Sequence, residues 1–219
     1  MRTTPTAQRI RLSLENAIVD GVYAPGDKLN PIRIAADYEC SRTPVREALQ
    51  ALEASGLVRV QPKKGTFVTQ LSVTELMERF EVMAELESLC ARLACRRATQ
   101  DDIGALTASF QACYDAAQAR QSDRYYAENT LFHQAIYRAA HNEFLEAETL
   151  CLQTVLQPYR RRQLRAQGRV RDSLGEHRLI LQAIAAGNSA DAARIMQDHV
   201  LVQGEGFRDM IAALTVAKG

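Results

Sequence analysis

The chain has 219 residues, of which 47% are hydrophobic and 24% are charged. This composition is typical of one large or two small folded domains and excludes an intrinsically disordered or collagen-like chain. The 27 basic and 26 acidic residues give a net charge of +1, so the total charge does not indicate a nucleic-acid partner. No apolar run approaches the roughly 18 residues of a membrane-spanning helix, and the first residues lack the hydrophobic segment of a signal peptide, so we expect a cytoplasmic protein.

The composition changes near Leu71. Three of the six prolines lie between residues 30 and 62, and the expected strand pair lies just beyond them, whereas the chain after about residue 72 has the spacing of successive helices. Residues 1–71 carry ten basic and seven acidic residues, net +3, and residues 72–219 carry 17 and 19, net −2. We therefore expect a basic first domain, 1–71, and an acidic second domain, 72–219.

In the first domain we expect three helices followed by a β-hairpin, the order of a winged helix-turn-helix. Apolar residues at helical spacing and turn residues predict the helices. Pro31 suits the first turn of the second helix, and Ser41 is placed to cap the third. Two β-prone runs joined by a basic, glycine-containing turn predict the hairpin. The predicted ranges are 7–20, 32–38 and 43–55 for the helices and 57–60 and 66–69 for the strands.

The second domain is predicted to be an all-α bundle of six helices. A capping box, Ser72 to Glu75, begins the first of them, and a second box, Ser173 to Glu176, predicts the start of the fifth. Gly187 and Asn188 end the fifth helix. The predicted ranges are 73–97, 100–119, 122–140, 143–167, 173–186 and 189–215. The apolar face of the first helix is predicted to consist of Leu76, Phe80, Met83, Leu86, Leu89 or Cys90, and Leu93.

Five cysteines are scattered along the chain without a CxxC pair. An odd and scattered set argues against a disulfide framework or a cysteine-ligated zinc ion. We expect them to be small, mostly buried apolar residues. They are Cys40, Cys90, Cys95, Cys113 and Cys151.

The third predicted helix carries Arg42 and Arg46 four residues apart, so both project from the same side near its start. An arginine there can donate two hydrogen bonds to a guanine in the major groove, worth about 1–3 kcal/mol of discrimination. The hydroxyls of Ser41 and Thr43 and the NH groups of the helix start suit phosphate. These positions therefore predict base and backbone contacts with DNA.

The predicted hairpin carries Lys63 and Lys64 at its tip, where they could reach phosphates or the adjacent minor groove. Gly65 beside them allows close backbone approach. Taken singly, each of these features is explained more readily as part of a solvated basic helix or an ordinary surface turn than as a DNA contact. Their combination in this order and spacing favours DNA binding.

The segment SRTPVREALQALEASGLV, followed by KKGTFV, resembles the DNA-binding domain of the GntR family of bacterial transcriptional regulators over about residues 7–70. The resemblance implies that Arg42, Thr43 and Arg46 read or clamp the operator, with Lys64 and Gly65 acting from the wing.

One position on the second predicted helix departs from this family. Many relatives have an arginine where this chain has Ile32, and Arg33 beside it is the candidate substitute.

Three histidines lie in separate predicted helices of the second domain: His133, His177 and His199. Asn129 lies one turn before His133. An i, i+4 pair and single histidines from two other helices can converge in a bundle core and offer three imidazoles and one oxygen to Zn²⁺ or a similar ion. Each histidine alone is explained more readily as a core or surface residue than as a ligand, and His141, at a predicted helix break, is interpreted in that way.

The segments NTLFHQAIYRAAHN, SLGEHRLILQAIAAGN and AARIMQDHV resemble the FCD effector domain of FadR-type regulators over about residues 73–205. The resemblance implies that Asn129, His133, His177 and His199 bind a divalent metal, zinc in the first place and nickel or manganese as alternatives. In the family an aspartate stands at the position of Asn129. Since an amide is a weaker ligand than a carboxylate, occupancy could be lower, the metal different, or the fourth ligand a water. Six helices rather than seven resemble the VanR-type branch.

The fourth helix of the second domain is rich in arginine, and Arg161 and Arg165 share a face by their spacing. An arginine that faces a metal-containing cavity would bind a carboxylate effector, an organic acid, in bidentate fashion. The alternative is a solvated positive stripe. Met83 stands where many relatives have an effector-binding arginine, so the identity of the ligand stays open.

We therefore expect a ligand-responsive transcription factor, a repressor, in which a homodimer binds a palindromic double-stranded DNA operator and an effector changes the arrangement of the two winged helices. A metal-dependent hydrolase is the alternative, because three histidines around zinc could generate hydroxide. No nucleophile motif or dedicated general base accompanies the histidines, which weakens it. A third interpretation is a structural histidine cluster in a bundle without a ligand.

Overall fold

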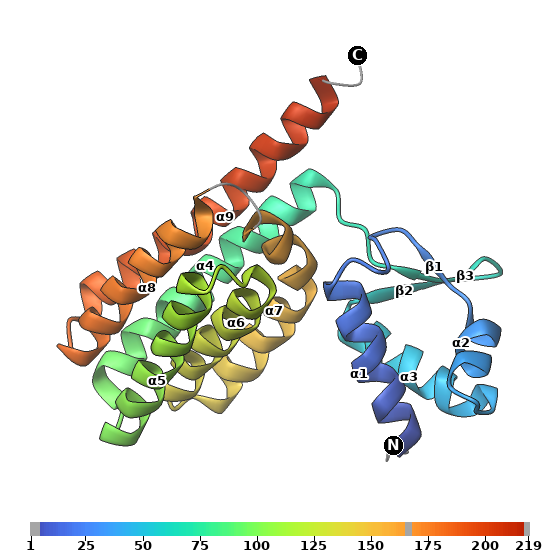
Figure 1. Cartoon of the computed structure of the whole chain (residues 1–219), viewed down its shortest axis with the longest axis horizontal. Helices are drawn as coiled ribbons and strands as arrows, with labels where there is room; N and C mark the ends of the chain where they lie inside the picture. Colours follow the sequence, from blue (N-terminus) through green and yellow to red (C-terminus); the bar gives the residue numbers. More distant parts are fainter. Residues whose placement is uncertain (1–4, 165–167, 217–219) are drawn as a thin grey trace. The chain divides into compact units, whose positions relative to one another are not determined.

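The computed structural model describes residues 5–164 and 168–216, without the side chains of residues 203–216. The chain divides into two compact units, Met1–Ser72 and Val73–Gly219, which we call the head unit and the body unit and describe separately (Figure 1). Within the described residues, no helix is long and apolar enough to cross a membrane.

The head unit is a winged helix-turn-helix, as predicted. Its three helices are followed by a hairpin, and a short additional strand completes an antiparallel three-stranded sheet of order β1-β3-β2. Strand β1 was not predicted, because two residues are too few to show an alternating pattern. The elements are α1 (Pro5–Val19), β1 (Lys28–Leu29), α2 (Pro31–Asp37), α3 (Arg42–Ala54), β2 (Val58–Gln61) and β3 (Gly65–Val68).

Helices α2 and α3 of the head unit differ in the capping hydrogen bonds at their starts. The Oδ1 atom of Asn30 accepts hydrogen bonds from the backbone N–H groups of Ile32 (2.9 Å) and Arg33 (3.3 Å), so a side chain caps α2. Ser41 lies at the predicted N-cap of α3, but its hydroxyl makes no capping hydrogen bond. The exposed Ser41 side chain therefore does not stabilise the helix start in the way its position predicts.

The core of the head unit is formed where one face of α1 and one face of α3 meet the sheet. The residues that fill it are apolar and at most 7% exposed, among them Ile10, Leu14, Val45, Leu52 and Val68. Because these residues recur every three or four positions in the helices, the opposite faces of α1 and α3 stay in solvent.

The described part of the body unit is an all-α bundle of six helices, as predicted, with α4 packed along α9 and α5 against α6 (Figure 1). The helices are α4 (Val73–Arg97), α5 (Gln100–Gln118), α6 (Ser122–Ala139), α7 (Glu143–Leu164), α8 (Arg169–Ala185) and α9 (Ser189–Val216).

Helix α8 begins one turn earlier than predicted. The left-handed Gly168 (φ 82°) precedes its first residue, so Ser173 lies inside the helix, fully buried. Its Oγ accepts a hydrogen bond from the Tyr125 hydroxyl (3.0 Å), and the predicted capping box is wrong. A true capping box occurs at α5, where Thr99 and Asp102 bond to each other's backbone N–H groups.

The buried face of α4 differs from the prediction. Leu86 and Leu93 are only half-buried, whereas alanines and the carboxylate of Glu87 face the interior. Leucines were assigned to the core for their hydrophobicity, and a glutamate was not. The buried residues of α4 are Leu76, Phe80, Met83, Ala84, Glu87, Cys90, Ala91 and Ala94.

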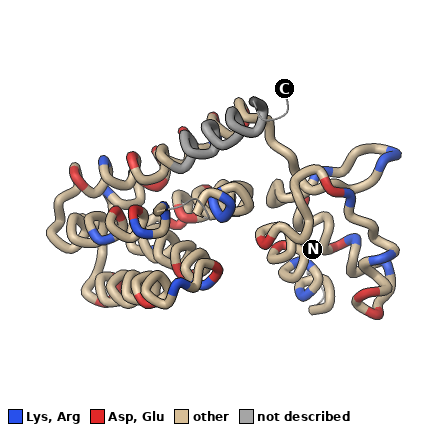
Figure 2. Tube along the Cα trace, turned by 45° about the horizontal axis from the view of Figure 1, so that its top comes forward, with Lys and Arg blue, Asp and Glu red and all other residues tan. Residues whose placement is uncertain are grey.

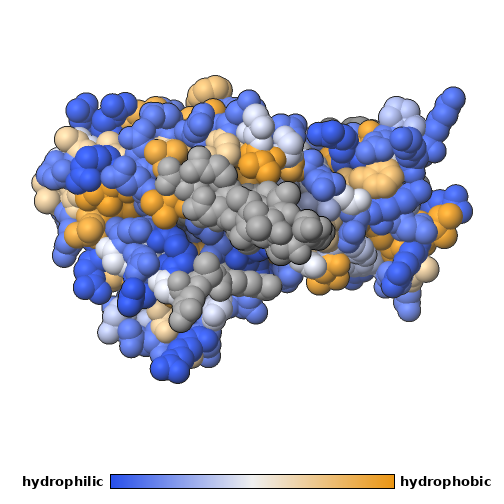
Figure 3. Space-filling model, turned by 90° about the horizontal axis from the view of Figure 1, so that it is seen from above, coloured by the Kyte–Doolittle hydropathy of each residue, from blue (hydrophilic) through white to orange (hydrophobic). Residues whose placement is uncertain are grey.

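All five cysteines are free thiols. Cys90 and Cys113 are buried as expected, Cys40 and Cys95 are half-buried, and Cys151 is exposed, which is contrary to the expectation. On the face seen in Figure 3, hydrophobic residues form small patches separated by hydrophilic ones.

Candidate DNA-reading surface and metal centre

The exposed face of α3 carries the residues predicted to read DNA. Arg42 and Arg46 are exposed, whereas Val45 and Leu49, on the other side of the helix, are buried in the core. The apolar face therefore fixes the orientation of α3, and the two arginines project into solvent. Basic positions of the head unit are marked in Figure 2. All eight predicted DNA contacts are exposed: Arg33, Ser41, Arg42, Thr43, Arg46, Lys63, Lys64 and Gly65.

The turn between β2 and β3 holds the two lysines of the wing. The backbone N–H of Lys64 donates to the carbonyl of Gln61 (3.0 Å), and Lys63 adopts a left-handed conformation (φ 63°). Gly65 has φ 118°, a backbone conformation that L side chains rarely adopt, so the position favours glycine. The tight turn keeps both lysines in solvent.

Arg33 on α2 is also exposed. Its Nε lies 3.9 Å from Oδ2 of Asp37, in an i, i+4 pair in which the arginine side chain is 81% exposed. Such a pair contributes little to stability because water screens it. The guanidinium is therefore available to a phosphate.

In the body unit, the three predicted histidines come together in the interior. His133 of α6, His177 of α8 and His199 of α9 are each at most 1% exposed, and each offers a ring nitrogen within 4.8 Å of the others. Nε2 of His133 lies 3.2 Å from Nε2 of His199. Two ligands of one tetrahedral zinc ion are about 3.3 Å apart, so this separation fits a shared ion.

Two residues, one of the three histidines and the asparagine one turn before His133 on α6, have buried polar atoms without a partner in the part of the chain that the structure describes. These atoms are both ring nitrogens of His177 and the Oδ1 atom of Asn129. His177 stacks on Phe132, with the ring centroids 4.3 Å apart, but makes no hydrogen bond. Since an unsatisfied buried polar group costs about 1–3 kcal/mol, such groups indicate a ligand that completes them.

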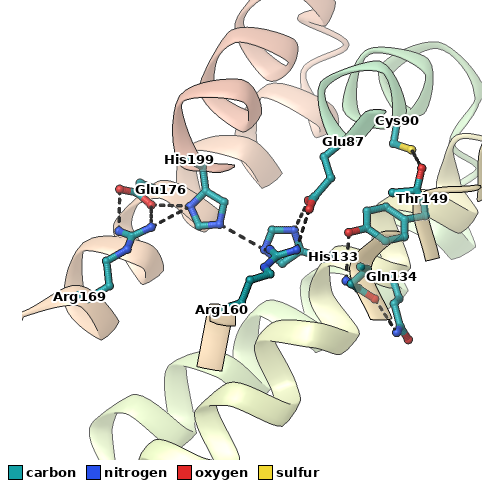
Figure 4. A network of polar contacts seen from close by, with 11 residues as sticks. Glu87, Cys90, His133, Gln134, Thr149, Arg160, Arg169, Glu176 and His199 are labelled. Atoms are coloured by element: carbon teal, nitrogen blue, oxygen red, sulfur yellow. Dashed lines mark hydrogen bonds and ion pairs between the residues drawn. The ribbon is translucent and has the colours of Figure 1, made fainter. Parts of the chain in front are cut away.

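A buried glutamate and a buried arginine, neither of them predicted, contact His133. Glu87 of α4 bonds to Nδ1 of His133 through Oε2, and its Oε1 accepts a hydrogen bond from Nη1 of Arg160 on α7 (2.8 Å). Nη2 of Arg160 lies 3.2 Å from Nε2 of His133 (Figure 4). Arg160 therefore contacts both the carboxylate and the ring.

A second glutamate–arginine pair lies beside His199. The Arg169 guanidinium donates to both oxygens of Glu176, at 2.9 and 2.7 Å, and Glu176 bonds to Nδ1 of His199 (Figure 4). Arg169 and Glu176 are seven residues apart on α8, which is about two turns, so they lie on the same face of the helix. Both histidines are thus held by a carboxylate at Nδ1, which directs Nε2 toward the centre.

The electrostatics of the cluster keep its imidazoles neutral. Burial lowers the pKa of His133, and it lowers the pKa of His199 to about 4 despite the hydrogen bond from that ring to Glu176. Burial, and then repulsion by the other two rings, holds the pKa of His177 well below its ordinary value. Neutral imidazole is the form that binds a metal.

The two glutamates are ionised. Burial alone would raise the pKa of Glu87, but the nearby His133 and Arg160 outweigh it and lower the pKa to about 2. Burial likewise opposes ionisation of Glu176, and its hydrogen bonds from His199 and Arg169 lower the pKa to about 2. Both carboxylates therefore only accept, and the hydrogens of His133 and His199 lie on Nδ1.

Of the two arginines predicted to bind an effector, Arg161 lies within the described residues. Among the described contacts, Arg161 pairs with Asp123 (2.8 Å) and lies over the ring of Tyr126 (5.4 Å). Its neighbour Arg160 contacts His133. Arg160 continues the buried face of α7, one turn after Leu156. Arg165 lies outside the described residues. His141 is exposed, as predicted, and pairs with Asp102 (2.7 Å).

Signals for the two missed residues exist in the sequence. Glu87 falls between Met83 and Cys90 at the spacing of the α4 core face, and Arg160 follows Leu156 at helical spacing. A charged residue at such a position indicates a buried polar site, because an unpaired charge is rarely placed in a core.

Two protein-family models match the chain. Residues 6–68 match the model described as "Bacterial regulatory proteins, gntR family", and residues 78–201 match the "FCD domain".

Curated relatives and solved structures agree with these matches. The chain is 30% identical to the HTH-type transcriptional regulator LutR of Bacillus subtilis over 206 residues, 84% of this chain and 92% of that protein. It is 29% identical to the HTH-type transcriptional repressor GlaR of Escherichia coli over 198 residues, 86% and 89% of the two chains. The structure of E. coli McbR/YncC superposes with a TM-score of 0.77 at 22% identity, over 99% of this chain and 100% of that one. LutR and GlaR are transcriptional regulators and not enzymes, which removes the hydrolase alternative. The chain belongs to the GntR family of transcriptional regulators and carries a C-terminal FCD domain.

Proposed function

We propose that this protein is a metabolite-responsive repressor that binds a palindromic operator as a homodimer, with DNA affinity controlled by a small organic acid at a metal ion in the body unit. The site of action is DNA, so we expect the protein in the cytoplasm. The name of GlaR, a repressor, supports the direction of control. The six described helices of the body unit support the VanR-like branch.

The observation that supports a bound ligand is that both ring nitrogens of His177 and Oδ1 of Asn129 are buried and have no partner among the described residues. A bundle that served only to support the head unit would be more stable with apolar side chains there. His177 lies beside His133 and His199, and Asn129 is buried one turn before His133 on α6, which supports a metal ion as the missing partner.

We assign His133, His177 and His199 as three ligands and Asn129 as the fourth, with zinc as the ion. Imidazoles suit zinc, and nickel is the alternative that they accept equally, whereas manganese prefers carboxylates. A bound ion would supply a Lewis-acidic anchor for an anion. The amide of Asn129 is a weaker ligand than a carboxylate, which favours exchange of that ligand for the effector or for water.

We assign the effector's carboxylate to Arg160 in place of Arg161. Arg160 lies against His133, and its side chain is 4% exposed, so an ion pair with a carboxylate there would be weakly screened by solvent. Arg165 stays a prediction from the sequence.

In the head unit, we propose that Arg42, Thr43 and Arg46 read or clamp the operator, with Ser41 and Arg33 on phosphates. Lys63, Lys64 and Gly65 act from the wing. A two-fold symmetric pair of such heads requires an operator with two half-sites.

The first experiment is an unbiased selection of operator sequences from random DNA with the full chain, followed by mapping on the genome. A palindromic sequence with salt-sensitive binding is expected. If no preferred sequence emerges, the proposal fails. Neighbouring metabolic genes of a mapped operator would give candidate effectors.

The second experiment measures zinc binding by metal analysis and by the melting temperature after chelation. We expect one ion per chain, a rise in melting temperature on addition of Zn²⁺, and loss of both in His177→Ala. Asn129→Asp should raise zinc affinity. Asn142→Asp introduces the same chemical change at the start of α7 and should have no effect on zinc. No bound zinc in the wild-type protein would leave a structural histidine cluster.

A further inference from the structure

The side chain of Arg160 uses two different nitrogens, one for a buried glutamate and one for the histidine cluster. Nη1 donates to Oε1 of Glu87 at 2.8 Å, and Nη2 lies 3.2 Å from Nε2 of His133 (Figure 4). Because Glu87 holds the hydrogen of His133 on Nδ1, the Nε2 atom carries a lone pair and accepts from Nη2. Arg160 therefore occupies the lone pair that a metal ion needs.

We infer that Arg160 and the metal ion compete for Nε2 of His133, and that the N–H group released by metal binding takes a carboxylate oxygen of an anion bound at the ion. The inference rests on the proposed metal site and deepens it. Metal and anion then bind cooperatively. The side chain of Arg160 stays in place whether or not either of them is bound.

The geometry supports a release that does not expel the arginine. Nη1 keeps its bond to Glu87, which is fully buried, so the guanidinium stays fixed while Nη2 loses its acceptor. The freed N–H is buried and unsatisfied, which costs free energy until an acceptor arrives. It lies next to His133, so an anion on the ion would be within its reach.

The other buried arginine provides a matched comparison. Arg169 has a similar burial and also pairs with a glutamate, but it donates to Glu176 and approaches His199 only at Nδ1 (3.4 Å). It does not contact an Nε2 atom among the described contacts. The two arginines therefore have the same charge near the cluster, and Arg160 alone of the pair contacts a nitrogen that the metal uses.

The test compares Arg160→Met with Arg169→Met in zinc titrations of the full chain. Methionine removes the charge and the donor in both variants. Arg160→Met should raise zinc affinity by about tenfold to a hundredfold, the factor of a hydrogen bond from a charged donor, and Arg169→Met should raise it less. Zinc affinity of Arg160→Met at or below the wild-type value, or an equal rise in both variants, would overturn the inference.

A second measurement uses the wild-type protein and does not depend on a variant that folds. Zinc is titrated in sodium acetate and in sodium nitrate at equal ionic strength. Acetate should raise the zinc affinity of the wild-type protein and of Arg169→Met, and acetate should stabilise the chain against heat only when zinc is present. In Arg160→Met the acetate effect should vanish.

The outcomes separate this inference from the proposed metal site. A wild-type protein that binds no zinc would overturn both. Zinc binding to the wild-type protein without an acetate effect, or an acetate effect that persists in Arg160→Met, would overturn the cooperative role of Arg160 and leave the metal site intact.

Discussion

The buried pair of Glu87 and Arg160 allows a quantitative prediction of stability. The two side chains are 0% and 4% exposed, and Oε1 lies 2.8 Å from Nη1. In Glu87→Gln the guanidinium would stay buried without a counter-charge, and an arginine cannot release its proton. Removing one partner of such a pair costs about 3–5 kcal/mol, a large part of the roughly 5–15 kcal/mol by which a folded protein is stable.

Removing the arginine should cost less. In Arg160→Met the carboxylate of Glu87 keeps its bond to His133, and it can also take up a proton, so no charge stays uncompensated. The double variant Glu87→Gln/Arg160→Met should be more stable than Glu87→Gln alone, because it buries no unpaired charge.

The assay is urea unfolding of the full chain followed by circular dichroism, with a chelator present so that metal binding does not contribute. The slope against urea should stay constant, which shows that the change is in stability. Asp198→Asn is the matched control, since Asp198 pairs with Arg194 at 3.3 Å on the surface and both side chains are more than 60% exposed. The reasoning is refuted if Glu87→Gln unfolds at the wild-type urea concentration or if the double variant is the least stable of the three.

Three further predictions concern the head unit, the helix caps and the thiols. Arg42→Ala and Arg46→Ala should each weaken binding to a selected operator by about 5-fold to 150-fold in a gel-shift titration and relax the sequence preference. Arg194→Ala, the control, should do neither. An unchanged sequence preference in Arg42→Ala and in Arg46→Ala would contradict base reading. Lys64→Ala should weaken binding to every sequence and reduce the salt dependence by about one counterion. Thr99→Ala should lower the free energy of unfolding by about 1 kcal/mol because Thr99 caps α5. Ser41→Ala should leave the free energy of unfolding unchanged because the Ser41 side chain makes no capping hydrogen bond. Equal effects of the two substitutions would contradict this assignment of the caps. The exposed Cys151 should react first with a thiol reagent at pH 8, since burial raises the pKa of Cys90 and Cys113 to about 12. Prompt reaction of all five thiols in the native chain would contradict the burial of Cys90 and Cys113.

Much of the fold follows from local patterns in the sequence. The ends of α4 and α5 were predicted within one residue, because apolar spacing and turn residues act over three or four positions. The start of α8 was placed four residues late, since Ser173 and Glu176 form a pattern that suits a cap and equally suits a helix interior. Strand β1 gave no local signal at all.

The candidate metal ligands were also accessible from the sequence. Asn129 and His133 share one face of a helix by their spacing, and His177 and His199 fall on the apolar faces of α8 and α9 beside Leu174 and Met196. Convergence of three such faces in one core follows from the way a bundle packs.

The sequence by itself determined the winged helix, the helical body and the three histidines, because each depends on periodicity within a single element. Only the tertiary structure decided which charged residues surround the histidines. Arg160 and Arg161 differ by about 100° around α7, and the packing of that helix turns the first inward and the second toward Asp123. Glu87 is likewise fixed by partners 46 and 73 residues away. A buried charge is stable only through such distant partners, so no local pattern identifies it.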